Sequence, residues 1–145
     1  MANESVPGSC LCEAVRFEIE LPTSVCGHCH CSVCRRNHGA SYVTWIGVPR
    51  TQLRMLAGEE VLTRFASSPH GVRSFCSRCG TSIFCELDHD PDTIDIPLAI
   101  MDGEIDRAPQ AHIYFDDRAS WVAVGDALPR LGGETGMQPI DAEDA

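Results

Sequence analysis

Apolar and polar residues alternate in short runs along much of the chain. Residues 14–20 alternate apolar and charged side chains, which is the period of a strand with one buried face, and Pro22 follows this run. Residues 41–48 are rich in β-branched and aromatic side chains and stop at Pro49. Both segments therefore predict β-strands.

Further segments of the same kind predict strands over residues 52–56, 61–65, 81–87, 93–101, 112–115 and 121–124. Gly58 lies between the first two of these strands and predicts that they form a hairpin. No window with the helical period reaches three turns, and the best helix candidates are a short segment after Cys34 and residues 116–119. The sequence thus predicts a mainly β domain of short antiparallel strands with minimal helix.

The last residues of the chain differ in composition from the rest. Residues 132–145 contain no aromatic and no basic residue but four acidic ones, which is typical of a segment that cannot bury enough apolar surface to fold. We therefore expect a disordered acidic tail there, and a single folded domain over residues 1–131.

Composition excludes several classes of protein. The hydrophobic fraction of 43% excludes disorder over the whole length. No apolar run approaches the roughly 20 residues of a membrane span, and the first residues lack the basic flank and apolar segment of a signal peptide, so we expect a cytoplasmic protein with no membrane partner. A net charge of −10 disfavours nucleic acid as a partner, although a local cluster of arginines remains compatible with a small anion.

Nine cysteines in 145 residues are the most unusual feature of the composition. Because the cytosol keeps thiols reduced and the count is odd, a disulfide framework is not expected. The cysteines instead fall into groups with spacings typical of zinc ligands, namely Cys10-x-Cys12, Cys26-x-x-Cys29-x-Cys31-x-x-Cys34 and Cys76-x-x-Cys79, with Cys85 alone. We interpret Cys85 as a buried thiol that packs as a small apolar side chain.

Two of the groups together predict a structural zinc site. Cys10 and Cys12 supply two sulfurs, and the knuckle formed by Cys76 and Cys79 and followed by Gly80 supplies two more. Four thiolates close a tetrahedral site, and closed sites stabilise the fold because they leave no position for a substrate.

The middle group, Cys29, Cys31 and Cys34, offers three ligands within six residues. Three protein ligands and one vacant position are the pattern of a catalytic zinc ion. Cys26 would close this site if its sulfur joined the others, and His28 and His30 are further candidate ligands. Spacing alone leaves the open and the closed interpretation standing.

Charged and aromatic residues near the middle group suggest further roles. Arg35 and Arg36 follow Cys34 directly, and they would either balance the charge of the thiolates or bind a substrate carboxylate. A histidine, either His28, His30 or His38, would be suited to move a proton near neutral pH. The two tryptophans, at positions 45 and 121, are interpreted as core residues.

Several of these motifs, taken in order, resemble the glutathione-dependent formaldehyde-activating enzyme family, which includes centromere protein V. The resemblance covers about residues 8–131 and rests on Gly8-Ser9-Cys10-Leu11-Cys12, Ala14-Val15-Arg16-Phe17, Cys29-His30-Cys31-Ser32-Val33-Cys34-Arg35, Gly39-Ala40, Gly58-Glu59, Arg73-Ser74-Phe75-Cys76-Ser77-Arg78-Cys79-Gly80-Thr81, His112-Ile113-Tyr114 and Trp121.

The resemblance implies a zinc-stabilised β-tent fold that binds two zinc ions. One ion would be structural, on Cys10, Cys12, Cys76 and Cys79, and the other catalytic, on Cys29, Cys31 and Cys34. It also implies a carbon–sulfur lyase that acts on thiol–aldehyde adducts such as S-hydroxymethylglutathione, with glutathione or a related thiol as the small-molecule partner. The alternative is a non-catalytic, zinc-stabilised protein-binding module, which would follow if Cys26 closed the middle site.

Overall fold

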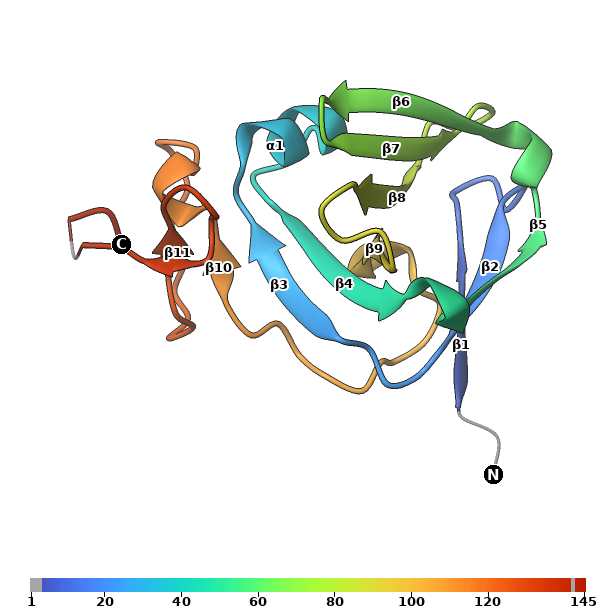
Figure 1. The fold of residues 1–145 in the computed structure, drawn as a ribbon, viewed down its shortest axis with the longest axis horizontal. Helices are drawn as coiled ribbons and strands as arrows, with labels where there is room; N and C mark the ends of the chain where they lie inside the picture. The colour runs from blue at the N-terminus through green and yellow to red at the C-terminus, as the bar shows by residue number, and fades with distance from the viewer. Residues whose placement is uncertain (1–3, 142) are drawn as a thin grey trace. The chain divides into compact units, whose positions relative to one another are not determined.

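A computed structural model describes residues 4–141 and 143–145 of the chain (Figure 1). The packing of its Cα atoms divides the chain into two compact units. The first unit comprises Met1–Val25 and Ile46–Ala108, and the second unit comprises Cys26–Trp45 and Pro109–Ala145. Two strands, β3 (Val25–Cys29) and β4 (Val43–Pro49), contain residues of both units.

The first unit is built from antiparallel strands (Figure 1). One sheet has the order β1-β2-β5, with bounds β1 (Ser5–Ser9), β2 (Arg16–Glu20) and β5 (Leu53–Ala57). A second series pairs in chain order, with bounds β6 (Leu62–Ser68), β7 (Gly71–Cys76), β8 (Ser82–Leu87) and β9 (Thr93–Pro97). Three 3-10 helices adjoin these strands: η1 (Arg50–Gln52) precedes β5, η2 (Glu59–Val61) lies between β5 and β6, and η3 (Leu98–Ile100) follows β9.

The core of the first unit follows from the alternation of residues in β2. Phe17 and Ile19 are fully buried, while the charged residues between and beside them are more exposed. The Phe17 ring meets Phe84 of β8 edge to face, with ring centroids 5.2 Å apart. Gly8 lies opposite Phe17, where a Cβ atom would collide with the ring. Burying each large apolar side chain of this kind contributes about 1.5–3 kcal/mol to folding.

The predicted hairpin around Gly58 is wrong, although both of its strands exist. β5 pairs with β2, and β6 pairs with β7. Gly58 has a φ of 88° and lies so close to the backbone of Ala14 that it has no room for a Cβ atom. With η2 following directly, this turn leads the chain out of one sheet and into another instead of folding β6 back onto β5.

In the second unit, β3 pairs in parallel with β10 (His112–Ile113), and η4 (Phe115–Asp117) follows β10. The strand predicted over residues 121–124 is wrong. Trp121 begins no strand but lies in a turn, in which the Val122 backbone N–H donates to the carbonyl of Ala119 at 3.1 Å. The Trp121 side chain is 72% exposed, so its predicted core position is wrong as well.

The predicted short helix near Cys34 is confirmed as α1 (Ser32–His38). It begins earlier than expected because Cys31 caps it: the Cys31 sulfur accepts a hydrogen bond from the Cys34 backbone N–H at 3.3 Å. Gly39 ends the helix in the left-handed conformation, with its N–H bonded to the carbonyl of Arg35. No helix within residues 4–141 and 143–145 is long and apolar enough to cross a membrane.

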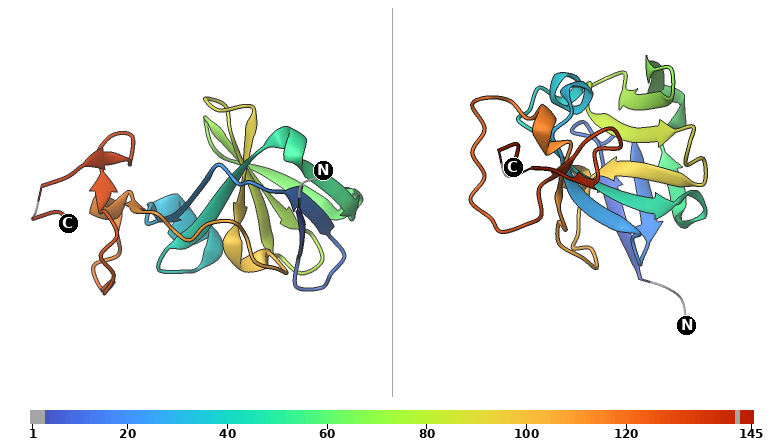
Figure 2. Two further views of the ribbon diagram at one scale, coloured as in Figure 1. Left: turned by 90° about the horizontal axis from the view of Figure 1, so that it is seen from below. Right: turned by 60° about the vertical axis from the view of Figure 1, so that its left-hand side comes forward.

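The segment expected to be a disordered tail makes defined contacts in the structure (Figure 2, red). β11 (Leu131–Gly132) pairs with β12 (Gln138–Pro139). The Gly136 carbonyl accepts a hydrogen bond from the Tyr114 backbone at 2.9 Å, and the Gly133 N–H donates to Asp116 at 2.9 Å. Backbone pairing through turn glycines holds this segment, and an apolar composition is not needed for such contacts.

Candidate metal centres

The first unit gathers four thiols into one cluster. The sulfurs of Cys10, Cys12, Cys76 and Cys79 all lie within 4.8 Å of one another. The Cys10–Cys12 and Cys12–Cys76 sulfur distances are 3.6 and 3.8 Å. Sulfurs bound at about 2.3 Å to a tetrahedral zinc ion are about 3.8 Å apart, so this cluster fits zinc by donor type and by spacing.

Two tight turns place these thiols. Cys10 follows β1, and the Cys10 N–H donates to the carbonyl of Val15 at 3.1 Å while the Glu13 N–H returns to the carbonyl of Cys10 at 3.0 Å. Cys76 ends β7, and the Gly80 N–H closes the knuckle on the carbonyl of Cys76 at 2.8 Å. Gly80 has a φ of 79°, which explains why glycine stands there.

The hydroxyl of Thr81 prepares one of these thiols for metal binding. It lies 3.2 Å from the sulfur of Cys79. Hydrogen bonds from Thr81, first of all from its side chain, lower the pKa of the Cys79 thiol to about 5. The cluster therefore contains a thiolate at neutral pH before any metal is bound.

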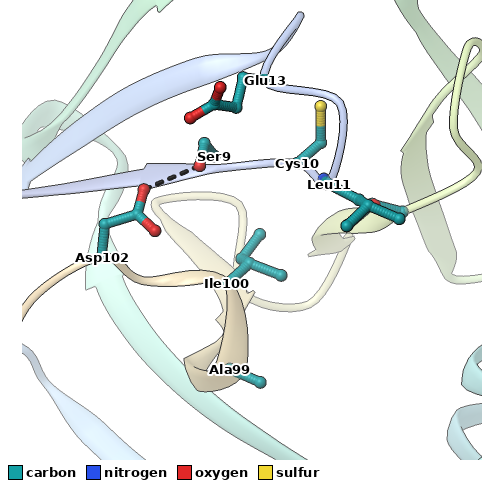
Figure 3. A pocket seen from close by; sticks show the side chains of 8 residues that line it. Ser9, Cys10, Leu11, Glu13, Ala99, Ile100 and Asp102 are labelled. Carbon is teal, nitrogen blue, oxygen red and sulfur yellow. Dashed lines mark hydrogen bonds between the residues drawn. The ribbon is translucent and has the colours of Figure 1, made fainter.

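A pocket of about 390 Å³ adjoins this cluster beside Cys10 (Figure 3). The Ser9 hydroxyl donates to the carboxylate of Asp102 at 2.8 Å on its wall, and Glu13 adds a second carboxylate. Two negative side chains do not suit an anionic ligand. Four thiols would also occupy all four coordination positions of a tetrahedral ion. This part of the first unit therefore fits a structural role better than a catalytic one.

The second unit gathers the middle group of thiols. The sulfurs of Cys29, Cys31 and Cys34 lie within 4.8 Å of one another, with 3.5 Å between Cys29 and Cys34. Cys29 ends β3, Cys31 caps α1, and Cys34 lies in the first turn of that helix. The strand-to-helix transition thus brings three sulfurs to one point.

Crowding of these thiols changes their protonation. Hydrogen bonds with Cys31 and then Cys34, together with burial, raise the pKa of the Cys29 thiol. Without a metal ion Cys29 is therefore protonated at neutral pH, and a dication would displace its proton. Donor type and spacing again fit zinc, with three protein ligands and one position left over.

Cys26 does not belong to the middle group within the described residues. It is fully buried, and its backbone N–H donates to the side chain of Gln110 at 3.1 Å. Cys26 and Cys29 are three residues apart on β3, and an odd spacing puts side chains on opposite faces of a strand. The open interpretation of the middle site is the one that this arrangement supports.

The candidate histidines also lie outside the group of three sulfurs. His28 Nδ1 lies 2.8 Å from the hydroxyl of Thr44, and His30 Nε2 lies 2.8 Å from Nδ1 of His112. The ring of His38 packs edge to face on Trp45 at 5.4 Å. Cys85 is 5% exposed, which confirms the prediction of a buried thiol.

Arg35 and Arg36 line a pocket of about 290 Å³ together with Trp121. Arg35 is partly committed to the fold, since its Nε donates to the carbonyl of His30 at 3.1 Å and its NH2 group to the carbonyl of Asp117 at 3.1 Å. Arg36 is exposed and has no ion-pair partner among the described residues. Of the two predicted arginines, Arg36 is the one available to a ligand.

Two residues near the middle group had no assigned role in the sequence. Tyr114 packs against the cluster of Cys29, Cys34 and Val43, and burial, followed by the charge of the nearby cysteines, raises the pKa of Tyr114. Asp126 binds the fully buried His112, with 2.9 Å between Asp126 Oδ2 and His112 Nε2. The His112-Ile113-Tyr114 motif was the only signal for this region, and nothing in the sequence distinguishes Asp126 from other acidic residues.

A mainly β fold with a four-thiol and a three-thiol cluster defines a cysteine-rich protein whose two clusters could each hold a metal ion such as zinc. The family model of the glutathione-dependent formaldehyde-activating enzyme matches residues 5–117. The chain belongs to this family, as its motifs predicted.

Curated relatives and a solved structure agree with this assignment. A Halomonas elongata protein, named as a glutathione-dependent formaldehyde-activating enzyme, is 28% identical over 81% of this chain and 79% of its own length. An uncharacterized lyase of Schizosaccharomyces pombe is 27% identical over 77% of this chain and 79% of its own length. A crystal structure of a Rhodobacter sphaeroides protein is 30% identical, with a TM-score of 0.58, over 68% of this chain and 89% of that one. Family and relatives together support a lyase-type enzyme.

Proposed function

We propose that this chain is a zinc-dependent carbon–sulfur lyase that acts on thiol–aldehyde adducts such as S-hydroxymethylglutathione. The observation that carries the proposal is the group of three thiols that Cys26 does not complete. Three ligands leave a tetrahedral ion one position for a substrate atom. The lyase names within the family support the type of reaction.

The reaction needs no oxidant and no reductant. The carbon–sulfur bond breaks, its electron pair goes to sulfur, and the adduct's hydroxyl proton leaves as the aldehyde C=O forms. The resulting thiolate then takes up a proton and becomes the free thiol. The same steps in reverse form the adduct. Cys29, Cys31 and Cys34 would hold a zinc ion, which would supply Lewis acidity for lowering the pKa of a thiol and stabilising negative charge on sulfur.

Residues beside the middle group have complementary tasks in this proposal. Arg36 binds a carboxylate of the thiol through its forked N–H groups, and the exposed ring of Trp121 packs on the apolar part of the substrate. Tyr114 keeps its hydroxyl proton, because its pKa is raised, and can donate a hydrogen bond at the metal centre. Arg35 holds the segment between Cys29 and Cys31 through the carbonyl of His30.

The binding-module alternative depended on closure of the middle site by Cys26. The grouping of the sulfurs does not support that closure. A lyase therefore remains the function that the site supports best.

The exchange between glutathione, formaldehyde and their adduct is measured by NMR. Because the adduct also forms without a catalyst, the spontaneous exchange rate is the reference. The zinc-loaded chain should accelerate the exchange above the spontaneous rate, and Cys34→Ser should abolish the acceleration while Cys26→Ala retains it. No acceleration by a chain that carries two zinc ions, with glutathione and with a panel of other thiols and aldehydes, would overturn the proposal.

A further inference from the structure

A second buried polar cluster in the second unit has no role in the proposed reaction. Its central residues, His30 and His112, are both fully buried, and their rings contact each other with centroids 5.0 Å apart. His30 also packs against Tyr42 and edge to face on Phe115. Buried imidazole nitrogens are costly without a partner. Three of the four ring nitrogens of these histidines have one, and within the described residues His30 Nδ1 has none.

Hydrogen bonds join these histidines to Asp126 in one line. His112 Nε2 lies 2.9 and 3.1 Å from the two carboxylate oxygens of Asp126. His112 Nδ1 lies 2.8 Å from Nε2 of His30. Asp126 is itself held by the backbone N–H of Leu128 at 3.0 Å, and Arg130 lies 3.4 Å from it.

The chemistry of the carboxylate sets the tautomer of both rings. The hydrogen bond from His112 lowers the pKa of Asp126, so Asp126 is ionised and accepts a hydrogen from His112 Nε2. With its Nε2 hydrogen donated to Asp126, His112 presents Nδ1 as the acceptor for the Nε2 hydrogen of His30. Donation in the opposite direction would require a charged imidazolium in a fully buried position.

The other contacts of His30 fix its backbone. The His30 N–H donates to the carbonyl of Ile113 at 3.0 Å, and the His30 carbonyl accepts from Arg35 Nε at 3.1 Å. With the ring bond to His112, this residue is held at its N–H, its carbonyl and its side chain. It is also the one residue between Cys29 and Cys31, so its position sets where those two side chains begin.

We propose that Asp126 and His112 are positioning residues, which hold His30 so that the sulfurs of Cys29 and Cys31 are placed for metal before the ion binds. The inference rests on the proposed metal ion at the middle group, but not on lyase activity. His30 acts through the backbone, because neither it nor His112 joins the group of three sulfurs. Groups that orient metal ligands from behind typically change metal affinity by about 10–100-fold when they are removed.

The experiment uses Asp126→Ala and His112→Phe in the full chain. Asp126 is 41% exposed, so its truncation is compatible with folding, and the phenyl ring preserves the bulk of His112 while removing both nitrogens. The exposed pair His70 and Asp88, 3.0 Å apart, supplies the matched controls His70→Phe and Asp88→Ala.

Metal affinity is measured by titration with Co²⁺ and competition with a chromophoric chelator, because thiolate-to-cobalt bands differ between three and four sulfur ligands. We expect about a 10–100-fold loss of affinity at the middle site in both variants, with the four-thiol site unchanged as internal reference. Asp126→Asn, which keeps an acceptor oxygen for His112, should restore most of the affinity.

Unchanged affinity at the middle site in Asp126→Ala would overturn the inference while leaving the proposed function intact. Equal losses at both sites, or the same loss in the His70→Phe control, would also overturn it, because they would indicate general destabilisation. The two proposals can also fail separately. A selective loss of affinity in the variants, together with a wild-type chain that binds two ions but has no lyase activity, would support the inference and contradict the proposed function.

Discussion

The alternation of side chains along β3 separates residues that look equivalent in the sequence. Cys29 joins two other thiols, whereas Cys26 does not, although both are cysteines in the same short strand. The physical reason is that successive side chains of a strand alternate between its two faces, so side chains three positions apart point to opposite faces. Even a buried thiol therefore contributes to metal binding only when its position in the strand allows it.

Substitution of these cysteines tests this difference. Cys26→Ala should retain two zinc ions per chain, while Cys34→Ala should retain one. The reason is that, of these two cysteines, Cys34 belongs to a sulfur group and Cys26 does not. Metal content after dialysis, measured by mass spectrometry, decides the matter. Loss of one ion from Cys26→Ala would restore the closed interpretation of the middle site.

Arg36 offers a second prediction for a single residue. Arg36→Ala should raise KM for an anionic thiol adduct about tenfold with little change in kcat, because a charge-assisted hydrogen bond of roughly 1.5 kcal/mol is lost in the ground state and the transition state alike. Steady-state kinetics at low and high salt measure both constants. Arg16→Ala, which removes the same charge from an exposed position of β2, is the control and should leave KM unchanged.

At the level of elements, turns decide which strands become neighbours. Residues 57–62 lead from β5 to β6 through Gly58 and η2, and each strand then pairs with a different partner. The absence of a side chain at Gly58 lets the backbone approach Ala14, which fixes the start of β2 against the end of β5. Close backbone approach, rather than the reversal of a hairpin, is the reason for this glycine.

Gly58→Ala should accordingly destabilise the chain by more than about 3 kcal/mol, because a positive φ and a collision with backbone atoms add together. Gly39 is a matched control: it has a φ of 60° but open space around its Cβ position. Gly39→Ala should cost only about 1 kcal/mol, the penalty of the left-handed conformation. Denaturant unfolding of the zinc-loaded variants compares the two, and equal effects would show that the close approach does not matter.

At the level of the whole molecule, each compact unit contains its own thiol cluster. The four-thiol cluster joins Cys10 and Cys12 to Cys76 and Cys79, which lie 64 or more positions further along the chain, within the first unit. Metal binding and folding are coupled in small zinc proteins, where the ion contributes on the order of 10 kcal/mol. Loss of one ion is therefore expected to affect mainly the unit that holds it.

Cys76→Ser tests this coupling. The variant should retain one zinc ion and lose amide protection mainly in Ile46–Ala108, whereas Cys34→Ser should lose protection mainly in Pro109–Ala145. Hydrogen exchange measured by mass spectrometry resolves the two parts of the chain. Full zinc content and an unchanged melting temperature in Cys76→Ser would contradict the structural role of the first cluster.

The metal-free chain should show a maximum of stability near the ordinary thiol pKa of about 8.5. Below that pH, the unfolded chain binds the Cys79 proton that the folded chain releases at a pKa of about 5, so stability rises with pH. Above it, the unfolded chain releases the Cys29 proton while the folded chain, whose Cys29 pKa is raised, keeps it, so stability falls. Urea unfolding in the presence of a chelator from pH 6 to 10 measures this profile, and a steady rise across the range would contradict it.

Local sequence patterns determined the strands β2, β4 and β8, the short helix at Cys34, and the two thiol groups, together with the family. These features depend on the residue period of a strand, on capping and on ligand spacing within a few residues, all of which act over short distances along the chain. The joining of Cys10 and Cys12 with Cys76 and Cys79 was also predictable, because two pairs complete one tetrahedral ion.

Tertiary structure alone decided which strands pair, how residues 131–139 contact Tyr114 and Asp116, and that Trp121 is exposed. It also brought Asp126 and His30, 96 positions apart, into one line of hydrogen bonds through His112. These outcomes depend on which backbone and side-chain groups form hydrogen bonds and contacts with one another in the folded chain. Many distant groups compete for each partner, and no local period or spacing in the sequence indicates which of them pair.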